Sequence, residues 1–342
     1  MMDRATIGAR SFLSLRRLPR EDWDRLLRDA ETLAGPRGRE PLIAGARFAM
    51  VFYNSSLRTR TSFEVACFDL GAHAVYLQVG GGLWQLEHRA GTVMDGEAAE
   101  HVKEGIGVLG RMVDGLGLRT FAGLKDAAID ATDPVLHAVA RASPVPVFNL
   151  ESAMDHPHQG LADALTLRRR WNGRKGRVVV QWAPHVKALP MAVPHAACLA
   201  FAREGHEVVL AHPKGFDLDA GVLSDAKRLA EESGGSFSVT NDRAAALAGA
   251  RAVYVKAWGS RGGYGDPAAA ANARAAHGDW QCTEASLAPT DDAIVMHCLP
   301  VRRNVVIADE VLDGPRSVVL EQGEARLHVQ KATLCRAMGA SP

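Results

Sequence analysis

Hydroxyl and arginine side chains are crowded into residues 52–64, FYNSSLRTRTSFE, between an apolar run and an amphipathic run. A helix can begin near Thr59, and its first backbone N–H groups, at the positive end of the helix dipole, attract anions. Ser56 and Thr59 add hydroxyl donors, whereas Arg58 and Arg60 add planar guanidinium groups that suit phosphate oxygens. The segment therefore predicts a phosphate site; a Ser/Thr helix cap with two solvated arginines is the alternative. The glycine-rich GxxxxGK(S/T) loop is absent from the sequence, so a nucleotide is not implied.

A second group of candidate residues follows the apolar run that ends at Leu150, in the segment NLESAMDHPHQGLAD. The group consists of Glu151, His156, His158 and Gln159. His156 can polarise a carbonyl or move a proton, because the ordinary pKa of histidine is ~6.5. Two histidines beside an acid also resemble a metal site, but the HxH spacing lacks a convincing third ligand. A capping role for the histidine is the remaining alternative.

The third group lies in MHCLPVRRN, around the end of the apolar run at 293–297. A cysteine such as Cys298 can act as a nucleophile, and a histidine such as His297 can act as its base. Neighbouring residues on a strand point to opposite faces, so the two are not expected to form a catalytic pair. Cys298 is instead predicted to line a pocket. Arg302 and Arg303 follow, where they can meet an acidic group or remain solvated.

Apolar runs alternate with amphipathic runs along the chain, and this alternation predicts parallel sheets covered by helices. The predicted strands are at 46–53, 72–79, 113–119, 145–150, 177–183, 206–213, 236–241, 251–258 and 293–300. Helical spacing is found at 60–71, 98–112, 133–142 and 158–171, and in a final amphipathic segment closed by Gly339. In such sheets ligands bind beyond the carboxyl ends of the strands, where the three groups of candidate residues lie.

Composition sets broad limits on what this chain is. Its 342 residues suffice for two domains of roughly 150 residues each. Lys and Arg number 40 against 39 Asp and Glu, so nothing favours nucleic acid or membrane partners. No run approaches the ~18 apolar residues of a membrane helix, and five cysteines without CxxC spacing indicate reduced thiols in a cytoplasm. The Arg-rich start is interrupted by acidic residues, so we expect folded protein there and not a transit peptide.

The motifs SxRTR at 56–60, HPxQ at 156–159 and HCLP at 297–300 together resemble the aspartate/ornithine carbamoyltransferase superfamily. The resemblance covers essentially the whole chain. It implies an α/β fold of two doubly wound domains, each a mainly parallel sheet flanked by helices, with the active site in the cleft between them. The phosphate predicted at SxRTR would then belong to carbamoyl phosphate.

The same resemblance implies which substrate each domain binds. A carbamoyl-phosphate-binding domain would span 1–152, with a C-terminal helix at 321–339 packing back on it, and an acylornithine-binding domain would span 153–320. The resemblance also implies a homotrimer whose active sites are shared across the subunit interface, so the neighbouring subunit would donate Trp84. Trp84 lies in the glycine-rich segment 80–97, which lacks periodicity. Such loops are often functional lids, and an ordinary surface loop is the alternative.

Carried over position by position, the resemblance implies two sets of binding residues. The carbamoyl-phosphate set is Ser56, Leu57, Arg58, Thr59, Trp84, Arg119, His156, Gln159 and Arg326. The acylornithine set is Glu151, His185, Lys256, Cys298, Leu299 and Arg302. Thr59, Arg119 and His156 would act as the catalytic donors to the negative charge that develops on the carbonyl oxygen. No metal and no redox cofactor would be required, because carbamoyl phosphate is already activated.

Three segments resemble the branch that carbamoylates N-acylated ornithine: VYVKAWG with Lys256, HCLPVRRN, and GEARLHVQKA. Ordinary ornithine enzymes carry an Asp and an SMG loop where this chain has Lys256 and Trp258. In N-acetylornithine enzymes a glutamate in the helix after TVMDG aligns with Ala99. Because this chain lacks that glutamate, no carboxylate at position 99 repels a succinyl group, which favours an N-succinyl substrate over an N-acetyl substrate. Val306 replaces a lysine that can be carboxylated in acetyl-type enzymes, so that modification is not expected here.

The expected reaction transfers the carbamoyl group of carbamoyl phosphate to the δ-amine of an N-acyl-L-ornithine, giving N-acyl-L-citrulline and phosphate in arginine biosynthesis. One alternative is an ordinary ornithine carbamoyltransferase, against which Lys256 counts. A second is a catalytically silent paralogue that binds a metabolite, against which the intact motif residues count. Composition also allows a doubly wound dehydrogenase, but no GxGxxG follows any predicted strand.

Overall fold

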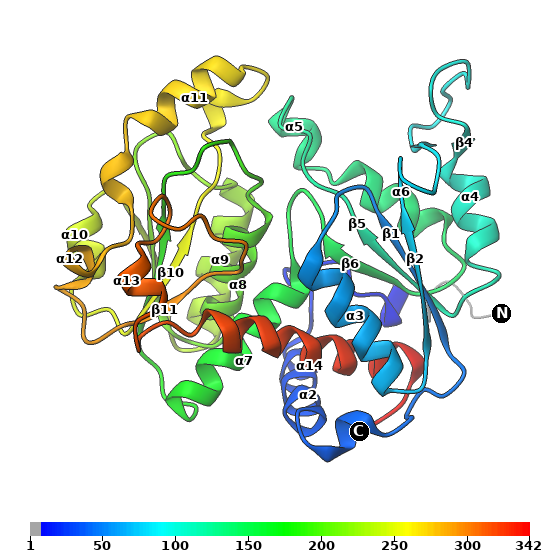
Figure 1. Ribbon diagram of the computed structural model, residues 1–342, viewed down its shortest axis with the longest axis horizontal. Helices are drawn as coiled ribbons and strands as arrows, with labels where there is room; N and C mark the ends of the chain where they lie inside the picture. Colours follow the sequence, from blue (N-terminus) through cyan, green and yellow to red (C-terminus); the bar gives the residue numbers. More distant parts are fainter. Residues whose placement is uncertain (1–7) are drawn as a thin grey trace. The chain divides into compact units, whose positions relative to one another are not determined.

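The computed structural model describes residues 8–342, so the first seven residues of the Arg-rich start, expected to be folded, lie outside the described range. The chain forms two compact units (Figure 1). Unit 1 contains the described chain up to Ala122, Thr132–His158 and Arg326–Pro342, and unit 2 contains Gly123–Ala131 and Gln159–Ala325. Apart from the excursion at 123–131, the chain passes from one unit to the other within two helices, α7 (Pro157–Trp171) and α14 (Val319–Met338).

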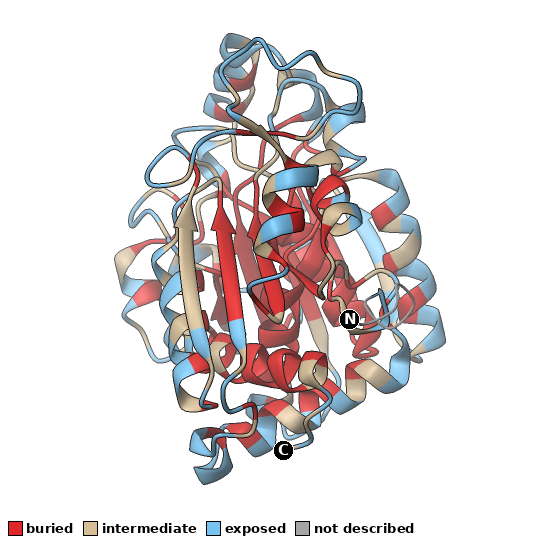
Figure 2. Cartoon of the chain, turned by 90° about the vertical axis from the view of Figure 1, so that its right-hand side faces the viewer, coloured by how far each residue is buried: buried red, intermediate tan, exposed pale blue. Residues whose placement is uncertain are grey.

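Unit 1 is built on a four-stranded parallel sheet with strand order β2-β1-β5-β6. Its strands are β1 (Arg47–Phe52), β2 (His73–Gln78), β5 (Gly115–Arg119) and β6 (Val147–Glu151), which confirms the four strands predicted in this part of the chain. Figure 2 shows β1 as buried and the edge strand β2 as partly exposed. Gly115 and Gly117 let β5 fit between its neighbours, since an added Cβ would lie 2.6 Å from Phe48 and from Leu150.

The register of this sheet brings the carboxyl ends of three strands together. Phe52 of β1 pairs with Arg119 of β5, and Arg119 pairs with Glu151 of β6. A register shift in β6 skips Leu150, so Glu151 lies opposite Arg119. The side chains that end these strands therefore meet at one edge of the sheet.

Helices flank the sheet of unit 1: α2 (Arg20–Leu33), η1 (Pro36–Arg39), α3 (Leu57–Asp69), α4 (Val102–Leu109), α6 (Pro134–Ala142) and the unit 1 parts of α7 and α14. Two short strands, β3 (Leu86–Glu87) and β4 (Glu100–His101), form a separate sheet. The helix predicted at 98–112 begins only at Val102, where the His101 ring caps it by accepting a hydrogen bond from Lys103 N–H. Ala99 consequently lies in the loop before β4, and its expected place in a helix is wrong.

Unit 2 contains a five-stranded parallel sheet with strand order β11-β10-β7-β8-β9. Its strands are β7 (Arg177–Trp182), β8 (Glu207–Ala211), β9 (Ser236–Thr240), β10 (Ala252–Lys256) and β11 (Ile294–Met296). The helices are α5 (Ala127–Asp130), α8 (Ala192–Arg203), α9 (Ala220–Glu232), α10 (Arg243–Leu247), η2 (Arg261–Gly263), α11 (Pro267–Ala275), η3 (Gly278–Trp280), α12 (Glu284–Leu287) and α13 (Asp309–Leu312). Each strand lies within a range predicted from the sequence. Trp258, at the start of the loop after β10, is buried and donates its indole N–H to Phe216 O at 2.7 Å.

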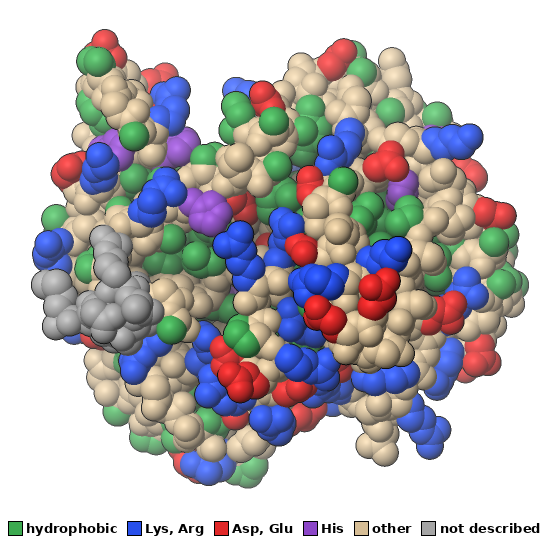
Figure 3. All heavy atoms as spheres, turned by 180° about the vertical axis from the view of Figure 1, so that it is seen from behind, with side chains coloured by type: hydrophobic (Ala, Val, Ile, Leu, Met, Phe, Trp, Pro, Cys, Tyr) green, Lys and Arg blue, Asp and Glu red, His purple; other side chains and the backbone are tan. Residues whose placement is uncertain are grey.

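Both units are thus parallel α/β sheets flanked by helices, and the predicted fold class is confirmed. All five cysteines are buried free thiols. Within residues 8–342, no helix is both long enough and apolar enough to cross a bilayer. Acidic and basic side chains are intermingled on the face in Figure 3, as expected from their nearly equal numbers. Helix α14 ends at Met338, and Gly339 follows at φ 71°, the left-handed conformation that glycine adopts easily.

Candidate active site

The N-terminus of α3 forms the phosphate end of the candidate site. Ser56 is the N-cap, and its hydroxyl oxygen accepts a hydrogen bond from Thr59 N–H at 3.2 Å. The N–H groups at the start of a helix lack acceptors within the helix, which makes this end attractive to an anion. Leu57 is 76% exposed here, whereas Thr59 is buried. The Thr59 hydroxyl oxygen accepts a hydrogen bond from Arg326 Nη2 at 2.7 Å.

The two arginines of SxRTR have different surroundings. Arg58 occupies the second position of α3 and is partly buried. Arg60 forms an ion pair with Glu64 at 3.0 Å, and its guanidinium lies 3.8 Å from the centre of the Tyr76 ring. Arg60, which residue type alone also offered for phosphate, thus contacts side chains of α3 and β2. Arg58 is the arginine of this motif in the predicted carbamoyl-phosphate set.

Arg119 is held at the end of β5 by bonds to two segments. Its Nη1 donates to Glu151 Oε2 at 2.5 Å, and its Nε donates to the backbone oxygen of Asn54 at 3.2 Å. The ion pair is buried, with 8% of the Arg119 side chain and 11% of the Glu151 side chain exposed. Glu151 has φ 142°, a conformation that L-residues rarely adopt, so the surrounding contacts must maintain it. Glu151, predicted to bind acylornithine, thus has a partner within unit 1.

His156 is a buried and neutral imidazole. Burial lowers its pKa well below the ordinary value, and the charges of Arg326 and Arg119 lower it further. Its Nε2 lies 3.6 Å from Glu151 Oε2, and its Nδ1 has no hydrogen-bond partner among residues 8–342. A neutral ring keeps one N–H to donate and one nitrogen to accept, which suits an uncharged carbonyl group.

Two buried carboxyl groups hold the turn that carries His156. Asp133 accepts a hydrogen bond from the Ser152 hydroxyl at 2.7 Å. Asp155 accepts one from Leu15 N–H at 2.7 Å, and burial raises its pKa to about 7. The sequence offered no signal for this support, because its partners come from distant parts of the chain.

His158 has a structural role, which argues against the metal alternative. Its Nδ1 lies 3.2 Å from Asn149 O and its Nε2 lies 3.1 Å from the Thr333 hydroxyl. Both ring nitrogens are therefore engaged, and burial lowers the pKa of the ring to about 3. No group of three or more His, Cys, Asp or Glu side chains in the described part of the chain is arranged to hold a metal ion.

Gln159 follows on α7 and belongs to unit 2. Its Nε2 donates to Asp163 Oδ1 at 2.8 Å, which fixes the orientation of the amide. The amide oxygen is buried and finds no hydrogen-bond partner in the described range. Gln159 therefore presents an unused acceptor, the type of group that binds an amide N–H.

Three cationic or ionisable candidates lie near each other in unit 2. Lys256, at the end of β10, is buried, and its ammonium group donates to Ala257 O at 3.1 Å. Burial lowers the pKa of His185, and the charges of Lys256 and Arg302 contribute to this shift. A neutral histidine beside two cations can recognise a carboxylate or an acyl oxygen.

The HCLP segment supplies two further candidates. Cys298 is buried, and Leu299 has φ 57°, a left-handed conformation that is uncommon for leucine. Arg303 pairs with Asp309 and Asp313 at 2.8 and 2.7 Å, which leaves Arg302 as the arginine of this segment for a ligand. Val306, which the resemblance aligns with a lysine of acetyl-type enzymes, is buried.

The loop at 80–99 carries the remaining candidates. Trp84 is 56% exposed, and its indole N–H donates to Glu100 Oε2 at 2.9 Å. Ala99 is exposed, and its backbone N–H donates to Gln85 O at 3.2 Å. Glu100 is thus already bonded to Trp84. Both candidates present exposed side chains on one loop of unit 1.

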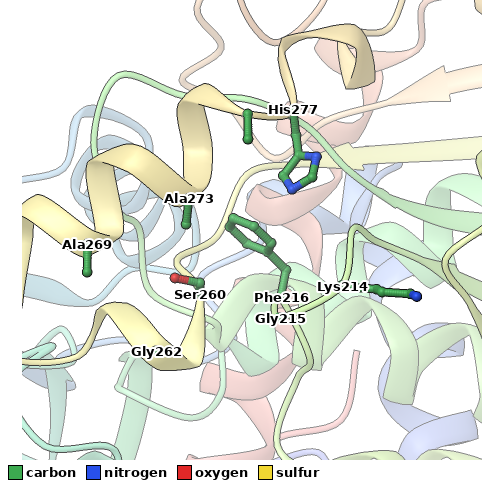
Figure 4. A pocket seen from close by; sticks show the side chains of 9 residues that line it. Lys214, Gly215, Phe216, Ser260, Gly262, Ala269, Ala273 and His277 are labelled. Atoms are coloured by element: carbon green, nitrogen blue, oxygen red, sulfur yellow. The ribbon is translucent and has the colours of Figure 1, made fainter.

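A pocket of about 410 Å³ in unit 2 is formed by other residues (Figure 4). It is lined by Lys214, Gly215, Phe216, Ser260, Gly262, Ala269, Ala273, Ala276 and His277. The lining contains none of the residues of the two predicted sets, so this pocket does not contribute to the candidate site.

Two family models match the chain. One, described as "Aspartate/ornithine carbamoyltransferase, carbamoyl-P binding domain", matches residues 10–169. The other, described as "Aspartate/ornithine carbamoyltransferase, Asp/Orn binding domain", matches residues 191–337. The chain belongs to the aspartate/ornithine carbamoyltransferase family. The superfamily predicted from the three motifs is confirmed.

The chain is similar both to relatives named for N-acetylornithine and to relatives named for N-succinylornithine. It is 40% identical over 329 residues to N-acetylornithine carbamoyltransferase of Xanthomonas campestris pv. campestris, covering 94% of this chain and 97% of the relative. It is 34% identical over 277 residues to N-succinylornithine carbamoyltransferase of Bacteroides thetaiotaomicron, covering 81% and 82%. A solved N-acetyl-L-ornithine transcarbamylase with one glutamate replaced by alanine, complexed with carbamyl phosphate and N-succinyl-L-norvaline, superposes with TM-score 0.92 at 39% identity, covering 95% of this chain and 98% of that one.

Asn54, two positions before SxRTR, is a residue of the site that was not among the candidates from the sequence. Its backbone oxygen accepts a hydrogen bond from Arg119 Nε, and its side-chain oxygen accepts one from Phe121 N–H at 2.8 Å. Asn54 therefore ties the end of β1 to the end of β5. An asparagine at the end of a predicted buried strand was the available signal.

Proposed function

We propose that this protein transfers the carbamoyl group of carbamoyl phosphate to the δ-amine of an N-acylated L-ornithine, with the N-succinyl substrate favoured over N-acetyl. The observation that carries the proposal is the buried cluster of donors at the strand ends of unit 1. Thr59, neutral His156 and the Arg119–Glu151 pair meet there beside the anion-attracting end of α3. The products are an N-acyl-L-citrulline and phosphate, as expected for a step of arginine biosynthesis.

The reaction requires stabilisation of one developing charge. The neutral δ-amine attacks the carbonyl carbon of carbamoyl phosphate, a C–N bond forms, and the carbonyl oxygen becomes negative. Thr59, Arg119 and neutral His156 are the donors assigned to that oxygen, and Arg119 retains Nη2, which its bonds to Glu151 and Asn54 do not use. The C–O bond to the phosphate then breaks, the phosphate leaves with the electron pair, and it takes up the proton released by the amine.

The other assigned residues hold the two substrates. Ser56, Leu57 and Arg58 at the start of α3 bind the phosphate group through N–H and guanidinium donors. Arg326 supports Thr59 and joins the carbamoyl group, and the free oxygen of Gln159 accepts from its amide N–H. On the other substrate, the assigned residues are Glu151, His185, Lys256, Cys298, Leu299 and Arg302. Positioning of both substrates accounts for much of the rate enhancement.

Exposure of the 80–99 loop supports a shared site. Trp84 is more than half exposed in the single chain and carries a large apolar ring. We assign it to the active site of a neighbouring subunit in a homotrimer that works in the cytoplasm, where the buried free thiols would stay reduced. Sedimentation analysis of the protein tests the trimer directly.

The assay that tests the function compares three acceptors side by side with carbamoyl phosphate: L-ornithine, N-acetyl-L-ornithine and N-succinyl-L-ornithine. The citrulline derivative formed is measured for each. Turnover of an acylated acceptor supports the proposal, and the faster of the two identifies the acyl group. Turnover of free ornithine alone would identify an ordinary ornithine carbamoyltransferase. No turnover with any acceptor would favour the silent paralogue.

Replacement of Ala99 with glutamate is expected to shift preference from the succinyl to the acetyl substrate. A carboxylate at this position would face the succinyl carboxylate, and like charges in a site cost several kcal/mol, so the ratio of the two kcat/KM values should change by about 100-fold. Ala98→Glu is the matched control, because it adds the same charge to the same loop one residue away. An unchanged ratio in Ala99→Glu, or the same shift in Ala98→Glu, would show that Ala99 does not select the acyl group.

A further inference from the structure

A continuous series of hydrogen bonds in unit 2 joins Gln159 of α7 to the backbone of the HCLP segment. Asp163 Oδ1 accepts from Gln159 Nε2 at 2.8 Å and from Gln322 Nε2 at 2.6 Å. Gln322 Oε1 accepts from His297 N–H at 2.9 Å, and His297 Nδ1 accepts from Leu299 N–H at 2.8 Å. Asp163 and Gln322 are each fully buried. One carboxylate oxygen thus connects two segments that the proposed function assigns to different substrates.

The chemistry of Asp163 fixes how both amides are oriented. Asp163 Oδ1 accepts from the amide nitrogen of both glutamines, so each glutamine turns its NH₂ group toward Asp163. The oxygen of Gln159 is then left for a ligand, and within the described residues it has no protein partner. The oxygen of Gln322 is directed to His297 N–H. A reversed amide at either position would place two oxygen acceptors against each other.

The HCLP segment needs such an anchor because its backbone is not in a relaxed conformation. Leu299 has φ 57°, a conformation that a residue with a Cβ adopts only at an energetic cost. The conformation therefore persists only where the surroundings hold it. The bond from His297 N–H to Gln322 and the bond from Leu299 N–H to the His297 ring hold it from the N-terminal side.

We propose that Asp163 and Gln322 are positioning residues that set the Gln159 oxygen for the carbamoyl N–H and, through His297, the Cys298–Leu299 backbone for the acylornithine. Neither residue touches a substrate. The identity of the two ligands rests on the proposed function, whereas the hydrogen bonds are seen in the structure itself. Disruption of the pair should weaken the binding of both substrates, although the Gln159 oxygen and the Cys298–Leu299 backbone are assigned to different substrates.

Gln322→Glu tests the pair, because it replaces only the side-chain NH₂ group that donates to Asp163 with an oxygen. The new carboxylate faces Asp163 where a donor stood, so at about pH 8 the KM of each substrate should rise about tenfold relative to wild type. As the pH falls, the carboxyl pair takes up a shared proton and a donor returns, so the KM ratio to wild type should fall toward one. Taking the ratio at each pH removes the contribution of groups that both proteins share, among them His297 and His185.

The double variant Asp163→Asn with Gln322→Glu is the matched rescue. Both wild-type bonds end on Asp163 Oδ1, so the asparagine side chain would rotate to keep its Oδ1 as acceptor for Gln159 and to turn its Nδ2 toward the carboxylate introduced at position 322, which still accepts from His297 N–H. The charge of the pair is unchanged and only one bond reverses its direction, so both KM values should return to within about twofold of wild type at about pH 8. A merely structural role of Gln322 would give neither the pH-dependent ratio nor this recovery.

Amide hydrogen exchange of the substrate-free proteins separates this inference from the proposed function. Gln322→Glu should speed the exchange of the His297 and Leu299 amides at about pH 8, and the double variant should restore their protection. This holds even if wild type fails to carbamoylate any acceptor, an outcome that would contradict only the proposed function. Unchanged exchange in Gln322→Glu, or KM values for an active enzyme that do not respond to it, would overturn the positioning role.

Discussion

Replacement of Arg119 with methionine is expected to lower kcat by about 10²–10³-fold, the usual effect of removing one preorganised donor from an oxyanion site. The change also leaves Glu151 buried without its cation, which typically costs about 3–5 kcal/mol of stability. The pKa of His156 should rise, because a positive charge that lowers it is lost. Steady-state kinetics and urea unfolding measure the two main effects separately.

The double variant Arg119→Met with Glu151→Leu distinguishes catalysis from stability. Without an unpaired carboxylate, the free energy of unfolding should recover most of its loss, because apolar replacement of a buried ion pair is often neutral or stabilising. The value of kcat should stay low, since the Arg119 donor is still missing and the Glu151 carboxylate assigned to acylornithine is now missing as well. Recovery of turnover together with stability would mean that the single variant was inactive only because it unfolded.

Arg58→Ala is expected to raise the Kd for carbamoyl phosphate by about 100-fold, close to the ~3 kcal/mol of a strong charge-assisted contact with phosphate. The fold should remain, because the cap of α3 depends on Ser56 and not on the arginine side chain. Titration calorimetry with carbamoyl phosphate gives the affinity, and far-UV circular dichroism gives the helix content.

Arg60→Ala is the matched control for this experiment, since the two arginines lie on the same helix and carry the same charge. Arg60 already pairs with Glu64 and stacks on Tyr76, so its loss should change the affinity by no more than about twofold. Near-normal binding in Arg58→Ala would remove the phosphate assignment. Equal losses in both variants would indicate general electrostatic attraction instead of a specific contact.

The strands and most helices could be predicted because their signals are local. A buried parallel strand is a short apolar run, and β1, β5 and β7 each coincide with one. The N-terminus of α3 was also visible, since Ser56 caps it within a few residues of the helix. The start of α4 was misplaced because the apolar spacing extends to Ala98, while the capping bond of His101 starts the helix later.

Side-chain pairing in the site could not be predicted in the same way. Residue type alone offered both Arg58 and Arg60 for phosphate, the resemblance selected Arg58, and the contacts of Arg60 with Glu64 and Tyr76 became visible only in the structure. Nor did the sequence indicate that Glu151, predicted to bind acylornithine, pairs with Arg119, because that pairing depends on the register shift in β6. Such outcomes depend on which residues lie across a strand pair, and a single strand does not contain that information.

The sequence by itself determined the alternation of strands and helices, the three motifs and through them the family. Tertiary structure alone decided that Arg326 bonds to Thr59 across 267 positions and that Gln322 bonds to Asp163 across 159. Helix and strand signals arise between residues a few positions apart, so the order of side chains encodes them directly. Buried polar groups take whichever partner the packing brings within about 3 Å, and that partner is known only when distant segments have come together.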